Sequence, residues 1–148
     1  MRFARIILGS LIGGYLLAGL GLGLAHLVAV TSVDAQGLAI NLIFGAAGLL
    51  IAAFVPAKGN RGTGLIAAGC LVLALAALTW SQVGVFRNAL TGEAREQIPE
   101  HDRVSMDLVA DQQSRDAAWL TGIGLGVIAF GAVARALGRN ENESTKVA

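Results

Sequence analysis

Four long apolar runs constrain this chain more than any other feature of its sequence. They cover about residues 6–30, 37–56, 63–82 and 117–137, and the first contains 25 residues without a charged side chain. An α-helix needs about 20 apolar residues to cross the hydrocarbon core of a bilayer. Apolar residues follow one another continuously in each run, which excludes the alternating strands of a membrane β-barrel. The sequence therefore predicts an all-α integral membrane protein, with four transmembrane helices in a single membrane domain of residues 1–148.

Composition agrees with lipid as the main solvent of the chain. Charged residues make up 14% of it, whereas soluble domains contain about 25%. No basic patch is interleaved with aromatic residues, so nucleic acid is not an expected partner. Cys70 is the one cysteine, and one thiol forms neither an intramolecular disulfide nor a structural zinc site. We expect no metal site, and we expect membrane lipids and other integral membrane proteins as partners.

The first apolar run has a rival interpretation as a signal peptide. Arg2 and Arg5 resemble the basic start of such a peptide, and residues 33–35 form a loose cleavage site. The apolar part of a signal peptide is only about 7–15 residues long, however. The longer run found here favours a transmembrane helix.

The basic residues beside the runs predict the orientation of the helices. Six of them fall on one side if the helices alternate in direction: Arg2, Arg5, Lys58, Arg61, Arg135 and Arg139. The first turn, on the other side, carries Asp34 and no basic residue, although Arg87 and Arg115 weaken the bias. We therefore expect both termini, including a tail of residues 138–148, on the cytoplasmic side of a bacterial inner membrane.

Residues 86–116 form a polar segment that lipid cannot hold, and the orientation places it outside the cell membrane. It contains four arginines and seven acidic residues, a formal charge of −3. We expect a short helix after Thr91, a break at Pro99, and a helix from about Asp102 that continues into the fourth run. Val104 and Leu108 lie one turn apart and give this helix a modest apolar stripe. Such an amphipathic cap lies on the membrane surface or docks on a partner.

Small residues recur four positions apart in the first and fourth runs. Membrane helices associate through close backbone contact, which small residues at this spacing permit. The predicted packing positions are Gly9, Gly13, Gly14, Ala18, Gly19, Gly23, Gly122 and Gly126. Gly13 and Gly14 are adjacent in the first run, and Gly122, Gly124 and Gly126 alternate in the fourth, so small residues occur on more than one face of each helix. This indicates neighbours both inside and outside the chain. The alternative is a general bias of the sequence toward glycine and alanine.

Four residues are predicted to lie at one depth near the outer ends of the helices: His26, Asn41, Trp80 and Trp119. They are candidates for a shallow site for a quinone, a pigment or a lipid headgroup. The alternative is the aromatic belt of an ordinary membrane protein, with one amide bond between helices. His26 is a weak candidate to bind haem, because the only other histidine is in the polar segment. No cofactor is predicted, whereas bound lipid is expected.

Charged residues inside membrane helices usually mark a functional path, and the middles of the four runs contain no arginine or acidic residue. The leading hypothesis is therefore a non-catalytic accessory or scaffolding subunit that packs against other transmembrane helices. A small oligomeric transporter or channel is one alternative. A cofactor- or quinone-binding membrane anchor is another.

Overall fold

The computed structural model describes residues 2–29, 35–56, 61–89, 91 and 96–144, and its long elements are all α-helices. They are α1 (Arg2–Ala29), α2 (Ala35–Phe54), α3 (Arg61–Ala89) and α5 (Glu100–Ser144). All four are long and apolar enough to cross a membrane. This confirms the four helices predicted from the apolar runs.

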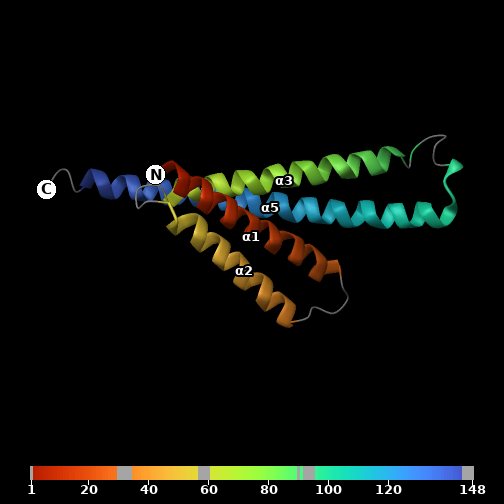
Figure 1. Cartoon of the computed structure of the whole chain (residues 1–148), viewed down its shortest axis with the longest axis horizontal. Helices are drawn as coiled ribbons and strands as arrows, with labels where there is room; N and C mark the ends of the chain where they lie inside the picture. The colour runs from red at the N-terminus through yellow and green to blue at the C-terminus, as the bar shows by residue number, and fades with distance from the viewer. Residues whose placement is uncertain (1, 30–34, 57–60, 90, 92–95, 145–148) are drawn as a thin grey trace.

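Successive helices run in opposite directions, so that α1 and α3 begin at the end of the molecule where α2 and α5 finish (Figure 1). The antiparallel pair of α3 and α5 is the most extensive contact in the fold. Helix α1 packs against both of them and against α2. Helix α2 contacts mainly α1 and diverges from the α3–α5 pair (Figure 1).

The helices extend beyond the apolar runs from which they were predicted. Helix α3 continues to Ala89, past the expected end of the third run at residue 82, because backbone hydrogen bonding does not stop where a helix leaves an apolar environment. Helix α2 ends at Phe54, two residues before Pro56, which lacks the amide hydrogen that a continuing helix needs.

Most of the polar segment belongs to α5, a continuous helix of 45 residues and about 67 Å in length at 1.5 Å per residue. The carbonyl oxygen of Pro99 accepts hydrogen bonds from the amides of Asp102 and Arg103, at 3.0 and 3.1 Å. Helix α5 thus begins directly after Pro99 and continues without interruption into the fourth run. The segment does not fold across the end of the bundle as a surface cap, because α5 continues alongside α3 (Figure 1). Of the helix expected after Thr91, residues 92–95 lie outside the described residues.

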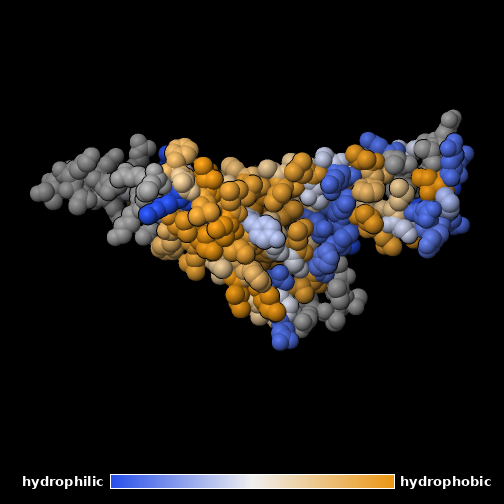
Figure 2. Space-filling view, in the orientation of Figure 1, coloured by the Kyte–Doolittle hydropathy of each residue, from blue (hydrophilic) through white to orange (hydrophobic). Residues whose placement is uncertain are grey.

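The core is built from small side chains. Leu17, Leu65 and Val72 are its largest fully buried members, and they are joined by alanines: Ala18, Ala52, Ala68 and Ala76. Large apolar side chains instead face outward from several helices, as Ile43, Leu78 and Phe130 do at 67%, 62% and 60% exposure. Apolar surface covers the part of the molecule that contains α1 and α2, and polar residues gather toward the far end of the α3–α5 pair (Figure 2).

Candidate functional site

Small residues of the first run bring α1 against α2. A Cβ atom placed on Gly13 would lie 2.7 Å from the carbonyl oxygen of Gly48, and one on Gly9 would lie 3.0 Å from the Cβ of Val55. A real Cβ essentially never approaches a backbone oxygen as closely as 2.7 Å, so Gly13 requires glycine for the observed separation of the helices. At Gly9 an added Cβ would be tight, and the Val55 side chain would have to shift by a few tenths of an ångström. Gly9 and Gly13 were both predicted to pack, whereas Gly48 was not.

The other packed positions of α1 face α3, the core and, nearer its C-terminal end, α2 again. A Cβ on Gly14 would lie 2.8 Å from Cδ2 of Leu71 in α3. Ala18 is buried in the core, and Gly23 lies beside the side-chain amide of Asn41 in α2. Helix α1 is therefore in close contact with its neighbours at several levels.

Four glycines that were not among the predicted packing positions bring α3 against α5. A Cβ on Gly62 would lie 2.5 Å from the carbonyl oxygen of Gly131, and one on Gly69 would lie 2.8 Å from that of Gly124. In each helix the two glycines are seven residues apart, which is two turns. This spacing in both the third and the fourth run is the signal that could have identified them.

Three predicted packing residues have no neighbour in the described part of the chain. A Cβ on Gly19, Gly122 or Gly126 would meet nothing within 4 Å, and all three residues are exposed. Ala118, Gly122 and Gly126 are four residues apart, so they share one face of α5. We call this face of α5 the small-residue face.

A shallow hollow lies on the small-residue face. Its volume is about 280 Å³, and it is lined by Ala118, Trp119, Gly122 and Ile123. Ala118 has only a methyl side chain and Gly122 has none, which leaves this space beside the Trp119 ring. The residues that line the hollow are mainly apolar and include no acid, base or nucleophile. It could therefore accommodate an apolar group but has no side chain that would react with it.

Gln112, in the N-terminal half of α5, links that helix to the C-terminal end of α1. Its Nε2 donates to Oδ1 of Asp116 at 2.8 Å and lies 3.3 Å from Nδ1 of His26, and its Oε1 accepts from Nη2 of Arg115 at 3.1 Å. The sequence analysis selected His26 but not Gln112. Gln112 belongs to the polar segment of residues 86–116, and nothing in its sequence context predicted that it would face α1.

No hydrogen bond joins any two of the four residues predicted to cluster, within the described ranges. Asn41 donates to the carbonyl of Gly37 in its own helix at 2.9 Å. Trp80 Nε1 donates to Oγ1 of Thr121 at 3.4 Å and thereby connects α3 with α5. Trp119 is 36% exposed and lines the hollow. The four residues thus make separate contacts rather than one shared set of ligands.

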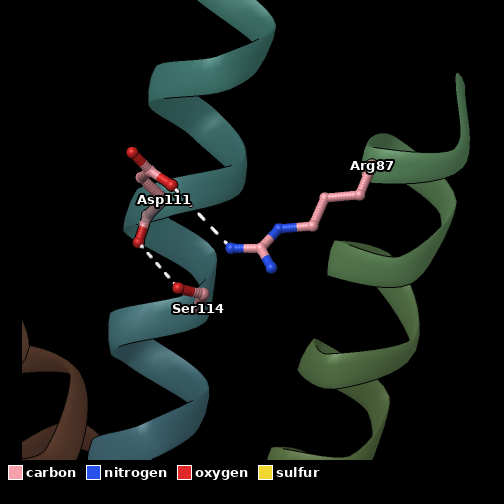
Figure 3. A network of polar contacts seen from close by, with 3 residues as sticks. All are labelled: Arg87, Asp111 and Ser114. Atoms are coloured by element: carbon pink, nitrogen blue, oxygen red, sulfur yellow. Dashed lines mark hydrogen bonds and ion pairs between the residues drawn. The ribbon is translucent and has the colours of Figure 1, made fainter. Parts of the chain in front are cut away.

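The polar ends of α3 and α5 are held together weakly. Arg87 Nη2 in α3 lies 3.9 Å from Oδ1 of Asp111 in α5, and both side chains are more than half exposed. Figure 3 shows this ion pair together with Ser114, whose hydroxyl donates to the carbonyl of Asp111 at 3.3 Å. Exposed pairs of this kind contribute about 0–1 kcal/mol. The close packing of α3 against α5 lies instead at the glycines and at buried apolar residues such as Val72 and Leu120.

In the part of the chain that the structure describes, no group of three His, Cys, Asp or Glu side chains is placed to hold a metal ion. Comparison with protein-family models, curated proteins and solved structures gives no match to this chain. The helices have several surfaces of small residues that allow close packing. One of them, the small-residue face of α5, is not covered by any other helix of the described residues.

Proposed function

We propose that this protein is a non-catalytic accessory or scaffolding subunit of a larger membrane complex. Its outward-facing leucine, isoleucine and phenylalanine side chains support embedding in a bilayer, because soluble monomers rarely expose apolar surface on this scale. The distribution of basic residues supports a bacterial inner membrane with both termini in the cytoplasm. The polar ends of α3 and α5 then extend into the extracytoplasmic space, where their acidic residues are available to a partner.

The small-residue face of α5 carries the proposal. Apolar side chains do not drive helices together in lipid, because lipid tails are equally apolar, so association depends on close van der Waals packing. Glycine costs about 1 kcal/mol in a helix relative to alanine. Gly62, Gly69 and Gly124 offset this cost by contacts inside the chain. Gly122 and Gly126 make no such contact, and a helix of another subunit would provide it.

The core favours a packing role over transport. Among the described residues Ser10 is the one buried polar side chain, and it is 7% exposed. Its hydroxyl lies 2.6 Å from the carbonyl of Ile6 and 3.3 Å from that of Gly64, so it connects α1 with α3. This position makes Ser10 a contact between helices, and it supplies no path for a charged solute.

The test is to replace Gly122 and Gly126 together with leucine. The variant should fold normally, because both sites are open, but it should no longer co-purify with its partner from native membranes in mild detergent. The matched control replaces Ala74 and Ala77, which are exposed on α3, with leucine and should retain the partner. Unchanged co-purification of the glycine variant would contradict the proposal.

A further inference from the structure

A second exposed stripe runs along α1, on a different helix from the small-residue face. Its members are Leu8, Ile12, Tyr15, Gly19 and Leu22, all of which are exposed. Their separations alternate between four and three residues, which is the 3.5-residue repeat of the seam between two supercoiled helices. We call this stripe the α1 seam. Within the described residues no other helix covers it.

Tyr15 is the unusual member of the α1 seam. It lies 12 residues after Phe3 and 13 before Val28, the ends of the apolar part of α1, and its side chain is 76% exposed. Either end of the span is therefore about 18–20 Å away along the helix, too far for the phenol to reach water. Tyrosines of membrane helices are enriched at the interface, where the hydroxyl is hydrated. In the described part of the chain the Tyr15 hydroxyl has no hydrogen bond, and leaving a hydroxyl unpaired in hydrocarbon is costly.

The partner of this hydroxyl must offer a hydrogen-bonding group at the middle of the bilayer. Lipid tails have none, and a single water molecule would need two to four polar partners, whereas Ile12 and Leu22 beside it are apolar. A second copy of the chain, inserted in the same direction, has its own Tyr15 at the same depth. One hydroxyl then donates to the other. Gly19, with nothing within 4 Å of its Cβ position, leaves room one turn away for the two helices to approach.

We propose that the α1 seam pairs with the α1 seam of a second copy, giving a two-fold symmetric dimer in which Tyr15 meets Tyr15. Two-fold dimers are by far the commonest soluble homo-oligomers, and the same patch of each copy forms their interface. This inference goes beyond the proposed function, because the dimer uses α1 and leaves the small-residue face of α5 open for a different subunit.

Cysteine cross-linking in native membranes tests the geometry. In a Cys70→Ala background, Leu8→Cys and Leu22→Cys should each give a covalent dimer of this chain with copper phenanthroline. Leu78→Cys and Phe130→Cys, exposed on α3 and α5, are the controls and should not. Cross-linking no greater than in the controls, or cross-linking of the seam to a different protein, would overturn the proposal.

Tyr15→Phe tests the hydrogen bond while keeping the ring. It should weaken dimerisation roughly threefold, the effect of an average hydrogen bond between membrane helices, as measured by energy transfer between labelled copies in micelles. Gly19→Leu should abolish the dimer. Replacing Gly122 and Gly126 with leucine should leave it intact, so a failed scaffold hypothesis and a failed dimer are distinguishable. An unchanged dimer in both Tyr15→Phe and Gly19→Leu would overturn the proposal.

Discussion

Gly13 of α1 and Gly48 of α2 pack directly against each other. A Cβ on Gly13 would lie 2.7 Å from the carbonyl oxygen of Gly48, and a Cβ on Gly48 would lie 2.9 Å from that of Gly13. Backbone meets backbone at this point, so neither side can yield by rotating a side chain. The two helices can approach this closely because both residues are glycines, which have no side chain.

Gly48→Leu should separate α1 from α2 and destabilise the fold. Overpacking of a tight contact typically costs about 1–3 kcal/mol, and the backbone contact here favours the upper part of that range. Ala46→Leu, on the exposed side of the same helix, is the control and should have little effect. The measurement is reversible unfolding in mixed micelles, and equal stability of the two variants would contradict the described contact.

Gly122 and Gly124 are two residues apart in α5, but substitution with leucine should destabilise the fold at only one of them. A Cβ on Gly124 would lie 2.8 Å from Cδ2 of Leu73 and 3.2 Å from the carbonyl oxygen of Gly69, whereas one on Gly122 would meet nothing. Gly124→Leu should therefore lower the stability of the isolated protein by about 1–3 kcal/mol, and Gly122→Leu should not. Thermal unfolding of the two variants decides this. A larger loss for Gly122→Leu would mean that α5 is rotated from the described position.

Gln112→Ala should loosen the C-terminal end of α1. The substitution removes the contacts to His26, Asp116 and Arg115, and each lost hydrogen bond contributes about 0.5–1.5 kcal/mol. Gln82→Ala, an exposed residue of α3, is the control. A double-mutant cycle between Gln112→Ala and His26→Ala should show coupling, because the two side chains are in contact. Strictly additive effects would show that this contact contributes nothing.

Arg103 should matter more than Arg87 to the polar ends of α3 and α5. Arg103 Nε donates to the carbonyl of Ile98 at 2.6 Å and Nη2 to that of Glu96 at 3.1 Å, so it holds the chain that leads into α5. Arg87 makes one exposed ion pair at 3.9 Å. Arg103→Ala should accelerate amide hydrogen exchange in residues 96–104 severalfold, and Arg87→Ala should leave it nearly unchanged. The reverse order would contradict the description of this region.

The sequence predicted the number and type of helices, because an uncharged run of 20 residues has few structural alternatives in lipid. It did not predict which side of each helix faces inward. A soluble helix marks its inner face by an apolar stripe, whereas these helices are apolar on all sides. Gly13 and Gly19 were therefore indistinguishable in the sequence, although one is packed and the other is open. For the same reason the sequence did not indicate that Tyr15 lies on the exposed side of α1.

Polar contacts were predicted less well than helices. His26 and Trp80 were expected to share one cluster, but each instead contacts a residue of α5, Gln112 and Thr121 respectively. Contacts between helices depend on rotation about each helix axis and on the register of the pair. Glycine contacts such as that of Gly69 with Gly124 fix the register of α3 and α5, and their seven-residue spacing was the available signal.

The most direct test of the account is native mass spectrometry of the wild-type protein, extracted from its own membrane in mild detergent. The account predicts a complex that contains this chain and at least one different integral membrane protein in fixed stoichiometry. That second protein should disappear from the spectrum of the variant with leucine at positions 122 and 126. A spectrum that contains only this chain, as a monomer or as copies of itself, would contradict the role of an accessory subunit.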